Sequence, residues 1–228
     1  MSHPLPIFPL PLVLFPGATQ PLHIFEPRYR CLLADCLAGD RRFGIVYASP
    51  AGPGEAEPVP APGATGCVAV IRAAEALADG RSNIVTVGER RFAMLEWVAS
   101  DRPYRVARVE PFDDDQEDAA ESARAAGVVR QRFARLMAAL AALTDHPPPD
   151  QPLPDDPQGL SFCVAAALTL GVETKAALLA SRGTASRLRR IDALLGPLTE
   201  DAERRAAVRR RARGNGRGGA QPRIERFQ

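Results

Sequence analysis

His23 and Glu26 are the two side chains whose types and spacing could support acid–base chemistry. An imidazole near a carboxylate can move a proton at neutral pH, and the two residues are three positions apart. However, Leu22 and Ile24 flank His23, which is typical of a strand, and Glu26 precedes Pro27 at the position of a helix N-cap. We therefore expect both side chains to have packing and capping roles, and no catalytic pair.

The candidate nucleophiles have no evident activating partners. Ser161 and Ser181 lack a nucleophile-elbow motif, and Cys163 follows Phe162 in an apolar run without an acid or base in register. Lys175 is the only lysine, and no glycine-rich phosphate-binding loop precedes it. The sequence therefore predicts no catalytic residue and no cofactor.

The cysteines and histidines do not have the spacing of metal ligands. They are Cys31, Cys36, Cys67 and Cys163, with His3, His23 and His146. Cys31 and Cys36 are five residues apart, so on a helix their side chains would point about 140° away from each other. This arrangement suits neither a disulfide bridge nor joint binding of a metal ion. We expect all four cysteines to be small buried residues in a reducing compartment, and no metal site.

The segment 14–30 combines prolines with aromatic and charged residues. A segment that proline has already ordered can receive an extended, apolar peptide at a small entropic cost. We predict a peptide-binding rim formed by Phe15, His23, Phe25, Glu26, Arg28 and Tyr29. Phe25 and Tyr29 also suit core positions, and Arg28 is the better candidate for the surface.

An Arg-rich region near the C-terminus offers a second type of surface. Residues 201–228 contain nine Arg and three acids, whereas the whole chain has a net charge of +2. The alternative hypothesis is RNA binding through phosphates, and its candidate residues are Arg182, Arg187, Arg190, Arg204 and Arg205. The region lacks the interleaved aromatic residues that would favour RNA binding. A solvated helix end followed by a flexible tail over 201–228 therefore also explains the excess of arginine.

Residues 1–112 predict a small barrel. The Pro-rich stretch 5–25 suggests two short edge strands around a Phe15-Pro16-Gly17 turn, because proline cannot donate to a strand ladder. Further β-rich stretches follow at 43–48, 65–74, 83–87, 92–98 and 104–109, and residues 88–91, which interrupt the strand begun at 83, suggest a bulge or corner. We expect about six short strands in an antiparallel, partly closed barrel.

One helix is inserted into this barrel. It is predicted to begin at Pro27 and to end at Gly39, which suits the C′ position. Its apolar stripe consists of Tyr29, Leu32, Leu33, Cys36 and Leu37. Residues 50–64 are rich in proline and glycine and are expected to form a long exposed loop.

Residues 113–200 predict a helical bundle. We interpret the acidic run 113–118 as a solvated helix cap, and the following helix has Val129, Phe133, Leu136, Met137, Leu140 and Leu143 on one face. Six prolines in 146–157 predict an extended crossing. Further helices are expected at 160–170, 175–180 and 185–195, with Thr174 and Thr184 as N-caps and Gly196-Pro197 as the last helix end.

The bulk composition is that of a globular protein. The chain has 228 residues, of which 46% are hydrophobic and 25% are charged. No apolar run approaches the ~20 residues that cross a bilayer, and no secretory signal is recognisable. We therefore expect a cytoplasmic protein without a membrane segment.

Several motifs, taken in order, resemble one known family. They are Leu14-Phe-Pro-Gly17, the decapeptide Pro21-Leu-His-Ile-Phe-Glu-Pro-Arg-Tyr-Arg30, Ala38-Gly-Asp-Arg-Arg-Phe-Gly44, Asp79-Gly-Arg81, Gly88-Glu-Arg-Arg-Phe92 and Pro103-Tyr-Arg-Val-Ala-Arg-Val-Glu-Pro111. Together with Gly66, they resemble the N-terminal, substrate-recognition domain of the ATP-dependent protease Lon. The resemblance covers about 195 residues and implies an α+β fold, with a PUA-like pseudobarrel followed by helices.

The departures from this family concern catalysis. Full-length Lon proteases continue into an ATPase with a phosphate-binding loop and a protease with a Ser–Lys dyad, and neither motif occurs in this sequence. The resemblance therefore implies a stand-alone, non-enzymatic module that binds unfolded or exposed polypeptide segments in a groove on the barrel or between barrel and helices. A role in protein quality control follows as an expectation, with a Lon-type protease as a candidate partner.

Overall fold

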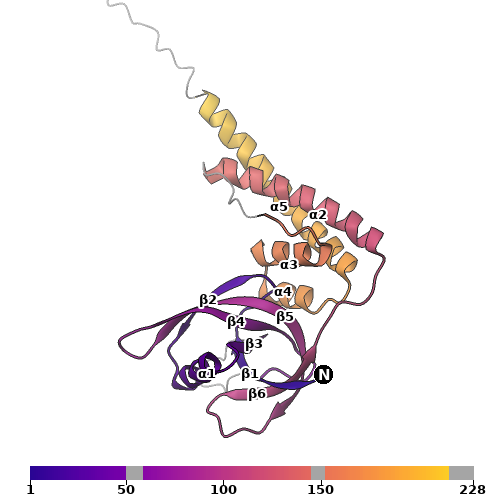
Figure 1. Ribbon diagram of the computed structural model, residues 1–228. Coiled ribbons are helices and arrows are strands. Elements are labelled where there is room, and N and C mark those ends of the chain that lie inside the picture. The colour runs from indigo at the N-terminus through magenta and orange to yellow at the C-terminus, as the bar shows by residue number, and fades with distance from the viewer. Residues whose placement is uncertain (50–58, 145–151, 216–228) are drawn as a thin grey trace, which may run out of the picture.

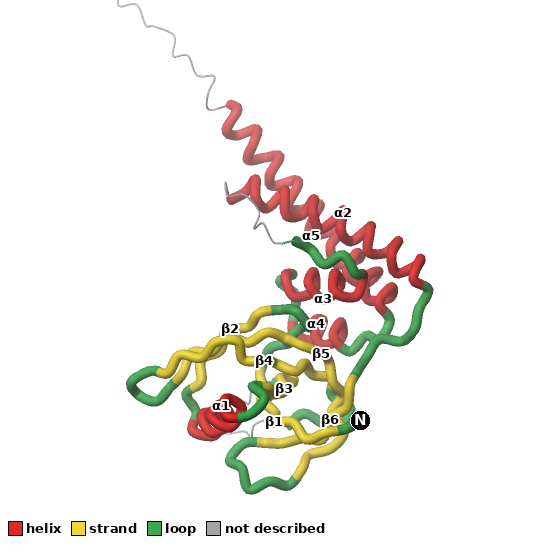
Figure 2. The backbone as a smooth tube through the Cα atoms, in the orientation of Figure 1, coloured by secondary structure: helices red, strands yellow, loops and turns green. Residues whose placement is uncertain are grey.

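The computed structural model describes residues 1–49, 59–144 and 152–215, and within these ranges the chain has an α+β fold with six strands and five helices (Figures 1 and 2). In chain order the elements are β1 (His3–Leu10), β2 (Thr19–Ile24), α1 (Pro27–Ala38), β3 (Arg42–Tyr47), β4 (Thr65–Ala76), β5 (Ser82–Val98), β6 (Arg105–Pro111), α2 (Ala119–Thr144), α3 (Pro157–Ala167), α4 (Val172–Leu179) and α5 (Thr184–Asn215). The expected fold, six strands with one inserted helix before a helical region, is confirmed.

The six strands form one mixed sheet in the order β2-β5-β4-β3-β1-β6, and β6 also pairs with β5. The 17-residue β5 pairs with β2 through 82–87 and with β6 through 92–98. The sheet therefore rolls into a pseudobarrel. Its ring consists of β5, β4, β3, β1 and β6, and β2 lies outside this ring as an edge strand paired with β5. The expectation of a wholly antiparallel sheet is wrong for β1 and β3, which run parallel because β2 and α1 together form a crossover between them.

The Pro-rich loop between β1 and β2 is fixed to the middle of β5. The Gly17 amide, in a residue with φ of 77°, donates to the Gly88 carbonyl at 2.8 Å, and the Gly88 amide donates to Ala18 at 2.9 Å. The predicted irregularity at 88–91 is present as a register shift, since Ala69 pairs with Gly88 but Cys67 pairs with Arg91. The loop therefore lies directly over this bulge.

Three hydrophobic clusters hold the fold together. The barrel interior contains Leu5, Ile7, Val46, Val68, Phe92, Met94, Ala107 and Val109. The other faces of the same strands pack with α1 through residues that include Phe8, Tyr29, Leu32, Leu33, Phe43 and Ile71. A third cluster unites α2, α3, α4 and α5, here called the bundle, and includes Phe15 from the Pro-rich loop. In Figure 1, α3 and α4 lie next to the barrel, with α2 and α5 beyond them.

Helix α5 is longer than the sequence pattern predicts. Gly196-Pro197 does not end it, and residues 201–215 are helical although we expected a flexible tail over 201–228. Pro197 has no amide proton, so α5 loses one backbone hydrogen bond at this position. Contacts beyond Pro197 compensate for this loss, because Ala202 and Ala206 are buried and Arg135 of α2 pairs with Glu203 at 3.0 Å. Residues 216–228 lie outside the described residues.

Other local expectations differ in detail. Gly39 does end α1, but with a φ of −106°, and the left-handed residue is Arg41 at 63°. Cys31 is exposed, whereas Cys36 and Cys67 are buried. Gly171, not Thr174, is the N-cap of α4. Residues 50–58 of the predicted loop and residues 146–151 of the predicted proline-rich crossing lie outside the described residues. Across those that are described, no helix combines the length and apolar character needed to cross a membrane.

Candidate functional site

Three ionised side chains are buried where the barrel meets the bundle. Asp114, in the linker after β6, lies between Arg91 of β5 and Arg187 of α5, and we call these three residues the Arg–Asp–Arg cluster. Arg187 binds the carboxylate through Nη2 to Oδ2 at 2.6 Å and Nη1 to Oδ1 at 3.1 Å, while Arg91 Nη2 donates to Oδ1. The exposed fraction of these side chains is 9% for Asp114, 2% for Arg91 and 0% for Arg187.

Neighbouring segments accept further hydrogen bonds from both guanidinium groups. Arg187 donates from Nε to Ser161 Oγ at 2.7 Å and from Nη1 to the Ser181 carbonyl at 2.7 Å. Arg91 Nη1 donates to the Leu179 and Ser181 carbonyls, each at 2.7 Å. Buried charges are tolerated when they are paired and fully hydrogen-bonded. The cluster therefore joins β5, the linker, α3, the end of α4 and the start of α5.

The charge balance sets the protonation states in the cluster. Burial by itself would raise the pKa of Asp114, but hydrogen bonds from Arg187 and Thr184 and the two guanidinium charges lower this pKa below its ordinary value. Burial lowers the pKa of Arg91, and the charge of Asp114 opposes this effect. The carboxylate consequently stays ionised between the two cations at neutral pH.

Two expectations from the sequence are therefore wrong. The acidic run 113–118 is not only a solvated cap, because Asp114 is buried, and Glu117 Oε2 accepts from the Ala185 amide at 2.8 Å at the start of α5. Arg187 is not on an exposed Arg-rich face, because its side chain is fully buried. The cluster fixes the bundle on the barrel and leaves no surface of Arg187 for a phosphate.

A cleft of about 640 Å³ lies between the barrel and the bundle, beside this cluster. One wall is the Pro-rich loop with the bulge of β5, the other is α3 with the segment before it, and Phe112 and Asp113 are at the junction. Its lining residues are Pro16, Gly17, Ala18, Thr19, Glu89, Arg90, Arg91, Phe112, Asp113, Pro152, Pro154, Asp156, Gln158, Gly159, Phe162, Cys163, Ala166 and Ala167.

The floor of the cleft is aromatic and rigid. The Phe162 ring lies 6.2 Å from Phe15, between centroids, and the guanidinium carbon of Arg187 lies 4.2 Å from the Phe162 centroid. The guanidinium carbon of Arg91 lies 4.9 Å from the centroid of Phe112. Cation–π contacts and close packing hold these rings in place. A ligand would therefore meet a preformed surface, in which these apolar groups are accompanied by charged side chains. The charged lining residues are Glu89, Arg90, Arg91, Asp113 and Asp156.

The walls of the cleft are also ordered before any ligand arrives. Arg130 of α2 donates to the Pro154 carbonyl at 2.6 Å, which fixes the segment before α3. Asp156 caps α3 by accepting from the Gly159 amide at 2.6 Å. On the opposite side, Gly17 and Gly88 fix the Pro-rich loop. Binding here would require little further ordering of the protein, which favours affinity.

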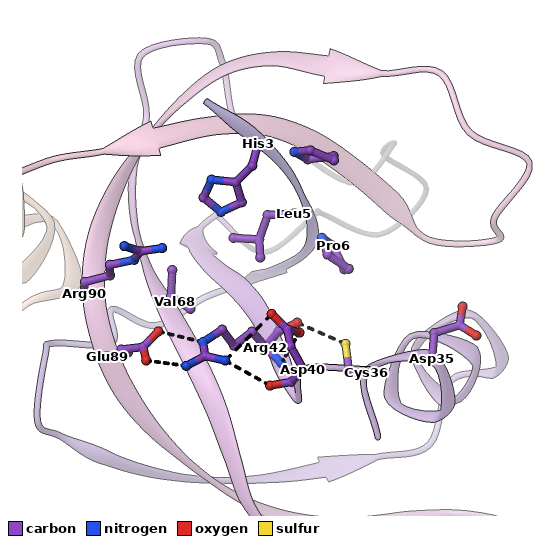
Figure 3. A pocket seen from close by; sticks show the side chains of 11 residues that line it. His3, Leu5, Pro6, Asp35, Cys36, Asp40, Arg42, Val68, Glu89 and Arg90 are labelled. Carbon is purple, nitrogen blue, oxygen red and sulfur yellow. Dashed lines mark hydrogen bonds and ion pairs between the residues drawn. The ribbon is translucent and has the colours of Figure 1, made fainter. Parts of the chain in front are cut away.

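A second cavity, of about 660 Å³, lies at one end of the barrel and is lined by both charged and apolar residues (Figure 3). Arg42 spans to Glu89 through two hydrogen bonds, of 2.9 Å from Nε and 2.7 Å from Nη2. The Cys36 thiol donates to the Arg42 carbonyl at 3.2 Å, and burial raises the pKa of this thiol to about 12. Among the lining residues no hydroxyl or thiol is hydrogen-bonded to a base, so the cavity offers no activated nucleophile.

Comparison with known proteins assigns the family. The family model described as "ATP-dependent protease La (LON) substrate-binding domain" matches residues 4–195. The chain belongs to this family. A Lon N-terminal domain protein from Xanthomonas campestris has a similar crystal structure, with a TM-score of 0.58 and 27% sequence identity over 84% of this chain and 98% of that one. The N-terminal domain of Mycobacterium avium complex Lon protease shares the fold, with a TM-score of 0.57 and 18% identity over 87% of this chain and 99% of that one.

The Lon-domain fold divides the predicted rim of 14–30 into separate parts. Phe15 and Tyr29 are 1% and 5% exposed, so their rings are core residues; Phe15 backs the cleft, and Tyr29 stacks on Phe8 with centroids 3.9 Å apart. Phe25 is 59% exposed, and its ring lies 6.0 Å from that of His23.

The charged residues of the rim form a third part. The expected capping role of the Glu26 side chain is wrong: its carboxylate pairs with Arg28 at 2.9 Å and, although Glu26 is the N-cap residue of α1, its side chain makes no capping hydrogen bond. His23 Nδ1 is hydrogen-bonded to Asn83 Oδ1 at 2.8 Å, across the β2–β5 pair, and not to Glu26. These contacts give His23 and Glu26 separate structural partners.

The arginines of the alternative surface are also separated. Arg182 is half exposed and pairs with Asp115 at 3.1 Å, and Arg190 is exposed on α5. Arg204 and Arg205 are each 70% exposed, and both pair with Asp201. Arg187 is the one member of the predicted set that is buried.

Sequence reasoning did not identify the α3 side of the cleft. Phe162, Cys163 and Ala166 come from a helix whose apolar residues surround its axis, so periodicity does not show which side faces the barrel. The apolar character on all sides was nevertheless a signal, because such a helix must pack on more than one partner. Arg91 and Phe112 gave no local signal, because the bulge of β5 places Arg91 and the linker after β6 places Phe112.

Proposed function

We propose that this Lon substrate-binding domain holds extended, apolar segments of other polypeptides in the cleft between barrel and bundle, without catalysing a reaction. The observation that carries the proposal is the cleft itself: an aromatic floor lies between two walls that prolines and hydrogen bonds have already ordered. Family membership adds that related domains are described as substrate-binding.

The expected affinity is modest. Burying one Leu- or Phe-sized side chain contributes about 1.5–3 kcal/mol, and the cleft is large enough for a few such groups. Association costs several kcal/mol, which the rigid walls reduce but do not remove. A dissociation constant in the range of ~1–100 µM follows, which suits transient holding of a segment.

The contacts of the candidate nucleophiles support a non-catalytic role. Ser161 donates its hydroxyl proton to the Gln158 carbonyl at 2.6 Å and accepts from Arg187. Lys175 Nζ donates to the Ala166 carbonyl at 3.2 Å, so it is not paired with a serine. Burial raises the pKa of Cys163, which disfavours its thiolate.

The test is binding of a chemically unfolded, reduced polypeptide to the purified chain, measured by fluorescence anisotropy. Ala167 lines the cleft and is exposed, so Ala167→Glu places a charge in the groove with little effect on folding. We expect this variant to weaken binding at least ~10-fold, because an unpaired charge beside apolar groups is costly. Ala134→Glu, on an exposed position of α2, is the matched control and should bind like the wild type.

Two results would refute the proposal. Absence of binding at about 100 µM polypeptide would place the affinity below ~5.5 kcal/mol. Equal binding by Ala167→Glu and the wild type would mean that the polypeptide binds elsewhere.

The exposed part of the predicted rim is tested in the same assay with Phe25→Ala. We propose that Phe25 and His23 add contacts to a long bound segment. This change should therefore weaken binding about 2–5-fold, a loss of ~0.4–1 kcal/mol.

We further propose that this binding serves protein quality control in the cytoplasm, with a Lon-type protease as partner. The prediction is that the chain changes the rate at which such a protease degrades an unfolded substrate, and that Ala167→Glu abolishes the change. An identical effect of the variant and the wild type would exclude the cleft from this role.

A second candidate function is RNA binding through α5. The observation in its favour is the exposure of Arg204 and Arg205, 70% for each side chain. This function predicts an affinity for RNA that falls steeply with salt and disappears on deletion of 201–228. Unchanged RNA affinity after the deletion would refute it.

A further inference from the structure

A third cavity combines three arginines with aromatic rings and has no acidic lining residue. It has a volume of about 310 Å³ and lies between the start of α1 and the turn that joins β5 to β6. Its lining residues are Arg28, Tyr29, Trp97, Val98, Ser100, Arg102, Pro103, Tyr104, Arg105 and Val106. We propose that this cavity binds an oxyanion, either a phosphate group or a carboxylate.

The charges at the cavity favour an anion. Arg28 and Arg102 are paired with acids that do not line the cavity, Glu26 and Asp35 respectively, so their guanidinium groups are held at its edge. Arg105 makes no ion pair among the residues that the structure describes, and its contact is the Trp97 ring, 5.5 Å from the guanidinium carbon to the centroid. An anion would therefore give Arg105 the partner that it lacks in the described structure.

The donors are also preorganised. The Arg28 guanidinium lies 4.5 Å from the centroid of Tyr29, which is itself stacked on Phe8. A guanidinium carries its N–H donors in its own plane, and contact with a ring restricts its rotamers, so less entropy is lost when it binds an oxyanion. Ser100 Oγ accepts from the Arg102 amide at 3.2 Å, which orients a hydroxyl that can donate to the ligand.

This site is separate from the proposed polypeptide cleft. The two cavities share no lining residue, so each can be altered without the other. The site goes beyond the proposed function and does not depend on it. Because the arginines are partly exposed, we expect a dissociation constant of about 1 mM for a free oxyanion at low salt.

Trp97 provides a direct measurement, because it is the only tryptophan in the sequence and it lines the cavity. The experiment follows its fluorescence while sodium phosphate is added at constant ionic strength, with chloride as the balancing anion. A parallel titration uses sodium acetate. A saturable change with phosphate alone identifies a phosphate site, and a saturable change with acetate alone identifies a carboxylate site.

Arg105→Gln removes the charge that has no acidic partner and should weaken oxyanion binding about 10-fold. Arg72→Gln, on the exposed part of β4 outside the cavity, is the matched control and should bind like the wild type. Isothermal calorimetry repeats the phosphate titration, because Arg105→Gln also changes the surroundings of the fluorophore. Far-UV circular dichroism checks that both variants are folded.

Three results would overturn the inference: no saturable change with either anion, equal binding by Arg105→Gln and the wild type, or equal weakening by both variants. Ala167→Glu should leave oxyanion binding unchanged. A chain that binds the oxyanion but no polypeptide would retain this inference and reject the proposed function, and the reverse result would do the opposite.

Discussion

The Arg–Asp–Arg cluster makes the stability of this domain depend on one carboxylate. Asp114→Asn keeps the shape of the side chain but removes the charge between two buried guanidinium groups. In the wild type, both carboxylate oxygens of Asp114 accept hydrogen bonds, from Arg91, Arg187 and Thr184. The amide of the variant keeps only one acceptor oxygen, and its NH₂ group faces donors that are themselves cationic. Removing one partner from a buried ion pair typically costs about 3–5 kcal/mol.

Urea unfolding followed by circular dichroism measures this cost. With a slope of about 2–3 kcal/mol per molar urea for a chain of this size, the midpoint should fall by roughly 1–2.5 M. Asp115→Asn is the matched control, because the Asp115 side chain is 64% exposed and pairs with Arg182. This substitution should change the free energy of unfolding by less than ~0.5 kcal/mol. A loss below ~1 kcal/mol for Asp114→Asn would show that the charge does not hold barrel and bundle together.

The effect should also depend on pH with a definite sign. The folded-state pKa of Asp114 is lowered, so its contribution to stability is complete above the unfolded pKa of about 3.9 and decreases as the pH falls through the folded value. The difference in unfolding free energy between the wild type and Asp114→Asn should therefore be constant from pH 5 to 7 and become smaller at lower pH. A difference that grows in acid would contradict this account.

Two further predictions concern cysteine burial and glycine packing. The exposed Cys31 should react rapidly with a thiol reagent at pH 8. Cys36 and Cys67 should react only after unfolding, because burial raises the pKa of each thiol to about 12. Fast labelling of all three cysteines would contradict the burial of Cys36 and Cys67. Gly88→Ala should destabilise the chain by about 1–3 kcal/mol, because the added Cβ would overlap the Pro-rich loop, 2.9 Å from the carbonyl carbon of Phe15. Gly127→Ala, on α2 with open space around the added Cβ, should stabilise the chain by about 0.5–1 kcal/mol. Equal urea midpoints for the two variants would refute this contrast.

The fold could be predicted where local patterns decide it. Pro27 begins α1 as predicted, Gly17 has the positive φ that the turn requires, and β3 is a central strand. The parallel pairing of Ile7 with Gly44 could not be predicted, because it depends on how α1 packs between two distant strands. Local sequence determines elements, and long-range packing determines their partners.

The candidate site was less predictable, because its residues come from distant segments. Arg187 was expected on the surface, yet it precedes Ile191 and Leu195 at helical spacing and so lies in register with the buried stripe of α5. That register was the available signal for its burial. Its partner Asp114 resembled a solvated helix cap, because the sequence does not show that the linker turns into the interface.

The distance along the chain between the members of the Arg–Asp–Arg cluster has a consequence for biosynthesis. The last barrel strand is complete at Pro111, but Arg187 leaves the ribosome only about seventy residues after Asp114. Until then Arg91 has no carbonyl acceptors from the Leu179–Ser181 turn, and the side of Phe15 that later meets Phe162 is uncovered. The nascent barrel therefore exposes an apolar face throughout the synthesis of the bundle, and a chaperone that shields it should raise the yield of folded protein.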